Sequence, residues 1–244
     1  LRGVMATIPV GISTAMVTTP VEPADWLLIA PVVVPILVGA LLLMLRGQVG
    51  IQAALANATL ALLVALTGGL LVHVYASGPQ AMTMGSWLPP FGISFSVDLT
   101  GAVLAFTASA VAFLCGLYSV ADIDLARRRY GFYPFLLLMM SGVNGAFLTG
   151  DVFNLYVWFE VLLISSFGLI VLGSERAQLD GAVKYAFLNL IGTTLFLIAT
   201  GYLYGTFGTL NMADIARGMG ALPDGAPVMT IAALFLFAFA MKAA

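Results

Sequence analysis

Apolar residues occur in long runs along the chain, and charged residues are concentrated in the short joins between these runs. The stretches Trp26–Leu45, Leu99–Ala121 and Tyr130–Gly150 contain no charged residue. Runs of about 20 apolar residues cross the hydrocarbon core of a bilayer as α-helices. The pattern therefore predicts an all-α polytopic membrane protein with about seven spans, at residues 25–45, 51–75, 98–120, 131–149, 152–173, 182–206 and 227 onward.

Two of the joins have patterns of their own. Within residues 77–97, the turn signal Pro89-Pro90-Phe91-Gly92 precedes an alternation of apolar and polar residues, which predicts a small external β-hairpin. Between the last two spans, Thr209 or Asn211 can cap a short helix that Gly218 ends. We expect this helix to lie at the membrane interface.

The basic residues in the joins predict the direction of the spans. Arg46, the run Arg127–Arg129 and Arg176 follow the first, third and fifth spans, whereas the other joins contain only Arg217. Connections on the cytoplasmic side carry an excess of Lys and Arg. The N-terminus is therefore expected outside, and the Arg127–Arg129 turn in the cytoplasm.

Composition supports this class and excludes several functions. Hydrophobic residues make up 61% of the 244 positions, charged residues 8%, and the mean hydropathy is +1.08. Nine basic and eleven acidic residues give no net field that would gather nucleic acid or acidic lipid. The sequence contains no phosphate-binding loop, no dinucleotide-binding glycine motif and no Cys or His cluster, so we expect no catalytic residue, cofactor or metal.

Glu160 is an acidic residue in the middle of a predicted span, where an unpaired carboxylate is costly. It lies roughly 13 Å along the helix from Asp151, which can cap the helix start. Lys242, in another apolar run, is the natural partner. At about 4 Å and an effective dielectric near 20 their attraction is on the order of 4 kcal/mol. Such a pair can couple a small motion to one proton transfer. The alternatives are a neutral, hydrogen-bonded Glu160 and a Lys242 that reaches the interface.

Other polar and small residues have a helical spacing. In the sixth span, Asn189, Thr193, Thr200 and Tyr204 share one face, and they either make interhelical hydrogen bonds or line a wet pathway. Lys184, three residues into this predicted span, can reach back to the interface. The third span carries a stripe of small residues that allows close helix packing, at Gly101, Ala105, Ala108, Ala112, Cys115 and Ser119.

Five segments together resemble the D subunit of Mrp-type multisubunit sodium/proton antiporters. They are TGDVFNLYVWFEVLL at 149–163, GSWLPPFGI at 85–93, KYAFLN at 184–189, YGTFGTLNMADIA at 204–216 and AFAMKAA at 238–244. These subunits are similar to the antiporter-like, proton-pumping subunits of respiratory complex I and of membrane-bound hydrogenases. The resemblance covers about residues 25 to 244.

The resemblance implies about fourteen helices, with two inverted five-helix units that each contribute a half-channel. Glu160 matches the family's fifth-helix glutamate, Lys242 its seventh-helix lysine, and Lys184 a recurring sixth-helix lysine. We therefore expect a fragment with an N-terminal extension of unknown role at 1–24, the first three helices and the hairpin at 25–129, and the start of an ion-translocating unit at 130–244.

Three functions follow from these observations. The first is a transporter subunit of a monovalent cation/proton antiporter, and not an enzyme, that carries protons and Na⁺ in a bacterial inner membrane together with other membrane subunits. The alternative is a proton-pumping subunit of a quinone oxidoreductase or membrane-bound hydrogenase. A third is a scaffold in which the charges fix helix register, so that removing them weakens assembly and leaves transport per complex unchanged.

Overall fold

The computed structural model describes residues 25–223 and 225–243, so the expected extension at 1–24 lies outside the described residues. Seven helices correspond to the seven expected spans. Five of them are long and apolar enough to cross a membrane, and α5 and α9 are apolar helices of 16 residues each. The seven are α1 (Trp26–Met44), α2 (Val49–Ser77), α3 (Leu99–Asp122), α5 (Phe132–Phe147), α6 (Val152–Val171), α7 (Arg176–Phe207) and α9 (Val228–Ala243).

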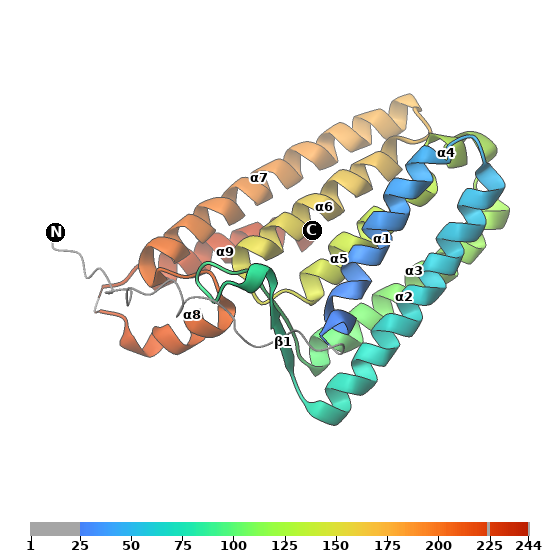
Figure 1. Cartoon of the computed structure of the whole chain (residues 1–244). Helices are drawn as coiled ribbons and strands as arrows, with labels where there is room; N and C mark the ends of the chain where they lie inside the picture. Colours follow the sequence, from blue (N-terminus) through green and yellow to red (C-terminus); the bar gives the residue numbers. More distant parts are fainter. Residues whose placement is uncertain (1–24, 224, 244) are drawn as a thin grey trace.

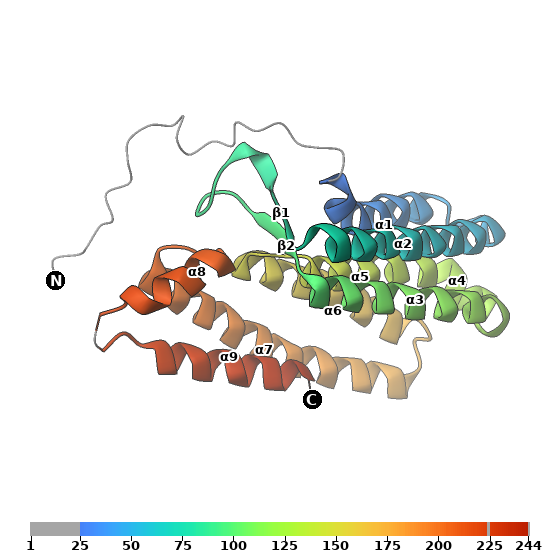
Figure 2. The same cartoon turned by 90° about the horizontal axis from the view of Figure 1, so that it is seen from below.

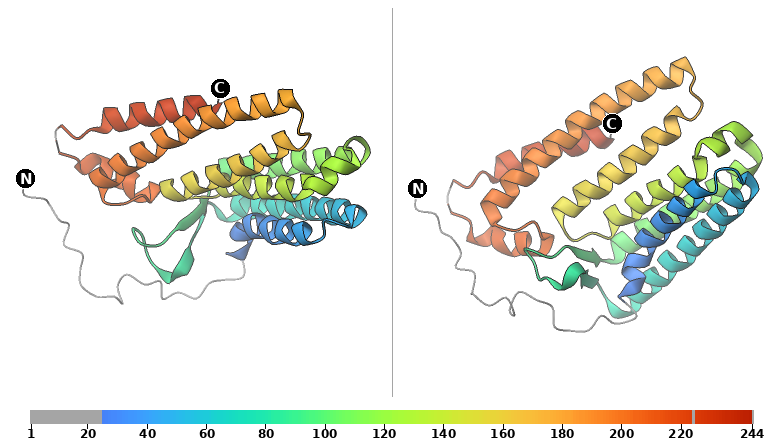
Figure 3. Two further views of the ribbon diagram at one scale, coloured as in Figure 1. Left: turned by 90° about the horizontal axis from the view of Figure 1, so that it is seen from above. Right: turned by 45° about the horizontal axis from the view of Figure 1, so that its top comes forward.

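The helices form a layered bundle with two distinct ends (Figures 1 and 2). Helices α1 and α2 cover one face of α3 and α5, α6 packs beside α5, and α7 and α9 pack together on the opposite side. The short helix α4 (Leu125–Tyr130) lies at one end, which we call the arginine-bearing end because it carries Arg46, Arg127–Arg129 and Arg176. The hairpin and the short helix α8 (Met212–Gly218) lie at the other, the hairpin end (Figure 3).

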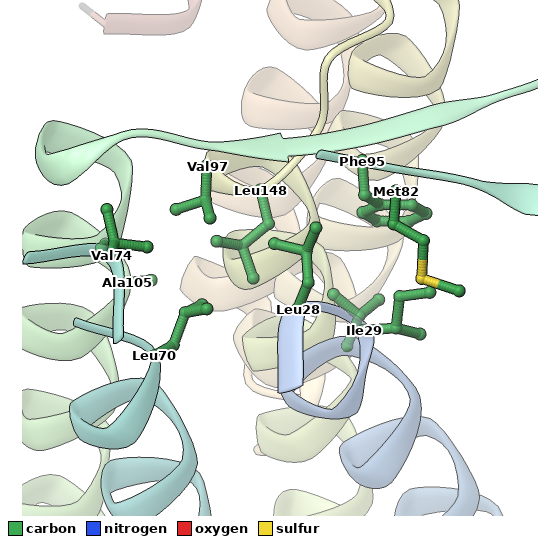
Figure 4. Packing of buried hydrophobic residues seen from close by; sticks show 11 residues of the cluster. Leu28, Ile29, Leu70, Val74, Met82, Phe95, Val97, Ala105 and Leu148 are labelled. Atoms are coloured by element: carbon green, nitrogen blue, oxygen red, sulfur yellow. The ribbon is translucent and has the colours of Figure 1, made fainter. Parts of the chain in front are cut away.

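The predicted hairpin is confirmed. Strands β1 (Gln80–Thr83) and β2 (Ser94–Val97) pair antiparallel. Figure 4 shows side chains of both strands packed against the helix ends beneath them, in a cluster that includes Leu28, Met82, Phe95 and Leu148. Because Phe95 is buried in this cluster, the hairpin is anchored to the bundle rather than free at its end.

Backbone hydrogen bonds join three segments at the hairpin end. The amide of Gly150, just before α6, donates to the Ser94 carbonyl of β2 at 2.9 Å. The Gly150 carbonyl accepts from the Met212 amide at 2.9 Å, and the Val152 amide donates to the Leu210 carbonyl at 2.9 Å. This three-segment ladder fixes the start of α6 between the hairpin and the start of α8.

The short helix predicted between the last two spans is present as α8. The side-chain oxygen of Asn211 accepts hydrogen bonds from the amides of Ala213 at 3.0 Å and Asp214 at 3.2 Å. A short polar side chain at this position satisfies amides that have no partner within the first turn. Asn211 is therefore the capping residue of the two that the sequence offered.

Two prolines in α1 explain a polar contact with α5. Pro35 has no amide hydrogen, so the Pro31 carbonyl lacks its usual helical donor. The Asn144 side-chain amide of α5 donates to this carbonyl at 3.2 Å, and the Ser141 hydroxyl donates to the neighbouring Val32 carbonyl at 2.9 Å. Asn144 and Ser141 are fully buried. These interhelical bonds fix α5 against α1.

The predicted start of the sixth span is wrong by about six residues, because α7 begins at Arg176 and not near residue 182. Glu175 and Gln178 form a capping box, in which the Glu175 amide donates to the Gln178 side-chain oxygen at 3.3 Å. Polar residues thus extend the helix beyond its apolar run. As a consequence Lys184 lies more than two turns inside α7 and not at its entry.

The small-residue stripe of α3 is only partly as predicted. Ala105, Ala112 and Ser119 are buried, but Cys115 is exposed. The buried face of α3 consists of Ala102, Ala105, Ser109, Ala112, Gly116 and Ser119. A shift of one residue turns a position by about 100° around the helix, which is why the neighbours of Cys115 differ so much from those of Gly116.

Candidate functional site

Three polar side chains from α6, α7 and α9 meet inside the apolar part of the bundle. The Thr193 hydroxyl of α7 donates a hydrogen bond to Glu160 Oε1 of α6 at 2.9 Å. The same hydroxyl oxygen accepts a hydrogen bond from Lys242 Nζ of α9 at 3.0 Å. Thr193 is 7% exposed, and the two charged side chains are half-buried. We call Glu160, Thr193 and Lys242 the polar triad.

The triad confirms that Glu160 and Lys242 come together but corrects how they do so. We expected a direct ion pair, and the structure instead places the Thr193 hydroxyl between the carboxylate and the ammonium group. The attraction is therefore weaker than the ~4 kcal/mol of a pair 4 Å apart at an effective dielectric near 20. The hydroxyl compensates by satisfying one hydrogen-bonding site on each charged group.

Gly192 allows α9 to approach α7 at the level of the triad. A Cβ atom at this position would lie 3.4 Å from Met241 Cβ and 3.7 Å from Lys242 Cγ. Ala238, one turn before Lys242, is completely buried in the same contact. The absence of a side chain at residue 192 thus brings the stem of Lys242 close enough for its ammonium group to reach Thr193.

Aromatic rings surround the triad on the side of the hairpin end. The Lys242 ammonium lies 5.3 Å from the centroid of the Phe159 ring, a position in which the ring face attracts a cation. Phe196, one turn from Thr193 on α7, is completely buried. Its ring centroid lies between 5.1 and 6.3 Å from those of Tyr156, Phe159, Phe235 and Phe239. This aromatic cluster makes the surroundings of the charged groups apolar on one side.

Of the other polar residues predicted on this face of α7, Asn189 and Thr200 bond within their own helix, and Tyr204 is exposed. The Asn189 amide donates to the Tyr185 carbonyl at 2.9 Å, and the Thr200 hydroxyl donates to the Phe196 carbonyl at 2.9 Å. Both are buried. Thr193 thus differs from Asn189 and Thr200, because its side chain bonds to two other helices.

Lys184 does not join the triad. Its Nζ atom lies 2.6 Å from Asp180 Oδ2, and both side chains are exposed. Lys184 precedes Thr193 by nine residues, or about 14 Å along α7, toward the arginine-bearing end. Asp151 has the predicted capping role, because its carboxylate accepts a hydrogen bond from the Asn154 amide at 2.8 Å.

Sequence reasoning did not identify Gly192, Phe159 or Phe196 as part of the site. Phe196 shares a helical face with Thr193, and Phe159 is next to Glu160 in the sequence. Their spacing could therefore have identified both residues as neighbours of the site. In the ranges that the structure describes, no three or more His, Cys, Asp or Glu side chains form a group that could hold a metal ion. The chemistry available to the triad is proton exchange between a carboxylate, a hydroxyl and an amine.

The part of the chain that carries the triad matches a known protein family, and most of the chain is similar to known proteins. The family described as "NADH:quinone oxidoreductase/Mrp antiporter, TM" matches residues 149–244, which contain the triad. The D subunit of a Na⁺/H⁺ antiporter from Alkalihalophilus pseudofirmus is 39% identical over 216 residues, covering 88% of this chain and 44% of that protein. The corresponding D subunit from Bacillus subtilis is 36% identical over 214 residues, covering 88% of this chain and 43% of that protein.

A solved structure agrees with these relatives. A chain in the structure of the Mrp complex from Dietzia sp. DQ12-45-1b superposes with a TM-score of 0.83 at 29% identity, over 91% of this chain and 42% of that chain. The chain thus spans less than half the length of the relatives that it matches. The sequence, the fold and the triad-bearing helices together show that this chain belongs to the NADH:quinone oxidoreductase/Mrp antiporter family, as a relative of the D subunits of Na⁺/H⁺ antiporters.

Proposed function

We propose that the full-length protein is a proton- and ion-translocating subunit of a multisubunit monovalent cation/proton antiporter, which exchanges Na⁺ for protons across a bacterial cell membrane. The observation that carries this proposal is the Thr193 hydroxyl, which is hydrogen-bonded to both intramembrane charges. Intramembrane ionisable groups that bond to one another are typical of proton relays. The names of the relatives support the antiporter class and its assembly with other membrane subunits.

The triad can transfer one proton from Lys242 to Glu160 through the Thr193 hydroxyl. Lys242 gives one proton from Nζ to the Thr193 oxygen, and Thr193 gives its own hydroxyl proton to Glu160 Oε1. The hydroxyl is regenerated, and the charged pair becomes a neutral amine and a neutral carboxylic acid. The reverse step restores the charges. Polar surroundings stabilise the charged pair, and apolar surroundings stabilise the neutral pair. A small displacement of α9 relative to α6 therefore shifts the equilibrium between the two pairs.

The remaining polar residues of α7 extend this proposal toward the arginine-bearing end. Asn189 lies one turn from Thr193 on the same face of α7 and extends the route toward that end, whereas Lys184 lies further along α7 on its opposite face and would serve a separate step. Thr200 lies on the opposite side of Phe196. The excess of arginine supports a cytoplasmic position for the arginine-bearing end and an external position for the hairpin end.

The proposal is tested by removing the central hydroxyl from the full-length protein in its complete complex. Thr193→Val keeps the size of the side chain, and we expect it to lower Na⁺-dependent proton exchange in everted vesicles at least tenfold. Thr193→Ser, which restores a hydroxyl, should retain most of the rate. Thr200→Val is the matched control, because Thr200 donates to a carbonyl of its own helix. A normal rate in Thr193→Val would overturn the relay.

The same measurement separates the antiporter from the redox alternative. The family description also includes NADH:quinone oxidoreductases, and the triad would serve a redox-driven pump equally well. An antiporter moves protons in response to a Na⁺ gradient without an electron donor. Proton movement that requires a donor and ignores Na⁺ would assign the protein to the redox class.

A further inference from the structure

The arginine-bearing end contains a hollow whose lining residues have no part in the polar triad. Arg46, Gly47, Arg129 and Tyr130 line a cavity of about 480 Å³ beside the ends of α1 and α4. Arg46 lies two residues after the end of α1, and Arg129 lies three residues before the start of α5. Both helices belong to the membrane-spanning bundle, so the hollow lies at the depth of the lipid headgroups.

The neighbouring arginines are already bound within the protein. Arg128 donates to the carbonyls that end α3, with its Nη2 atom 2.6 Å from the Val120 oxygen and its Nε atom 2.8 Å from the Ile123 oxygen. Arg127 lies 3.5 Å from an Asp124 carboxylate oxygen and 3.7 Å from one of Glu175. These two arginines serve to hold helix ends together.

Arg46 and Arg129 differ from them. In the part of the chain that the structure describes, neither side chain makes a hydrogen bond or an ion pair, and both are exposed. Two guanidinium groups that face one hollow without an acidic partner leave up to about ten donors for an anion with several oxygens. The chemistry that fits this arrangement is a phosphate group.

We propose that this hollow binds the phosphodiester headgroup of an anionic membrane lipid. Arginine holds phosphate oxygens through paired hydrogen bonds, and basic pockets between membrane helices bind anionic headgroups. Tyr130 adds a phenol whose hydroxyl can bond to the headgroup while its ring faces the acyl chains. The net charge of −2 does not predict binding of an anionic lipid. The site arises because two positive charges lie beside the same hollow.

The test measures phosphatidylglycerol binding to the complete, purified complex in neutral detergent, by native mass spectrometry during a lipid titration. Each arginine near an anionic headgroup is expected to strengthen binding about fivefold, and the pair about thirtyfold. Arg46→Gln with Arg129→Gln should therefore weaken phosphatidylglycerol binding by about thirtyfold. The double Arg→Lys variant, which keeps both charges but not the paired hydrogen bonds of the guanidinium groups, should lose less binding than the double Gln variant.

Arg176→Gln is the matched control, because Arg176 is an exposed arginine at the same end that does not line the hollow. We expect this variant to bind phosphatidylglycerol as the unmodified complex does, and phosphatidylcholine to bind weakly to every form. Unchanged binding in the double Gln variant, or an equal loss in Arg176→Gln, would overturn the site. Displacement of phosphatidylglycerol by millimolar inorganic phosphate would show that the hollow binds a free anion and not a lipid headgroup.

Discussion

Gly192 lies directly beneath the stem of Lys242, at a distance where a Cβ atom would be 3.7 Å from Lys242 Cγ. An alanine at this position fits at ordinary van der Waals contact. A larger, branched side chain does not, because its methyl groups would extend toward Met241 and Lys242. The packing of α9 on α7 at residue 192 therefore determines whether Lys242 can reach Thr193.

We expect Gly192→Ala to retain most of the Na⁺-dependent proton exchange, and Gly192→Val to lower it at least tenfold by moving Lys242 away from Thr193. Initial rates in everted vesicles, normalised to the amount of assembled complex, provide the measurement. Gly181→Val is the control, since no atom lies within 4 Å of a Cβ at residue 181 of the same helix. Equal rates for Gly192→Val and Gly181→Val would contradict the predicted displacement.

Variants that remove the charge of Glu160 or Lys242 distinguish a proton relay from a structural scaffold. Glu160→Gln keeps an oxygen that can accept the Thr193 hydrogen bond, and Lys242→Met keeps most of the length of the side chain. Neither variant can exchange the proton of the original group. We expect both to assemble normally and to lose nearly all cation-dependent proton exchange. Poor assembly with a normal rate per assembled complex would favour the scaffold.

Lys184 provides a prediction of smaller effect. It lies about 14 Å from the triad along α7 and forms an exposed pair with Asp180, so it can serve only a separate step of the route. Lys184→Gln is expected to lower the exchange rate a fewfold without changing assembly, because an exposed pair of this spacing contributes only about 0.3–0.5 kcal/mol to the helix. Lys184→Arg, which keeps the charge but holds its proton more tightly than an amine does, should be equally slow. An unchanged rate in both variants would remove Lys184 from the route.

The contact between α1 and α5 predicts an effect on stability. Asn144→Ala leaves the Pro31 carbonyl without a donor in a buried contact, which should cost about 1 kcal/mol. For a domain of this size that loss lowers the midpoint of thermal unfolding by about 2–4 °C. Thr107→Ala is the control, because Thr107 is bonded to a carbonyl of its own helix at an exposed position. Equal midpoints for the two variants would contradict the role of Asn144.

The sequence predicted the elements that depend on local pattern. Apolar runs located the spans, and the turn signal at residues 89–92 located the hairpin. The start of α7 was missed because hydropathy marks the apolar part of a helix, whereas the helix itself begins at the polar capping box of Glu175 and Gln178.

The site required information that local pattern does not contain. Glu160, Thr193 and Lys242 were each identified, but the order in which they are bonded depends on how α6, α7 and α9 are rotated about their axes. A rotation of one residue, as at Cys115 and Gly116 of α3, changes which side chain faces a neighbour. The position of Thr193 between the charges therefore became visible only in the assembled bundle.

The three-segment ladder at the hairpin end has a mechanical consequence. Its hydrogen bonds resist relative motion of the segments, so the hairpin, the first turn of α6 and the first turn of α8 form a single rigid unit. Glu160 lies on α6, and the residues at the start of this helix, Gly150 and Val152, make the hydrogen bonds to the other two segments. We therefore expect a displacement of the hairpin to tilt α6 and to move the Glu160 carboxylate, which lies about 13 Å along the helix from Asp151.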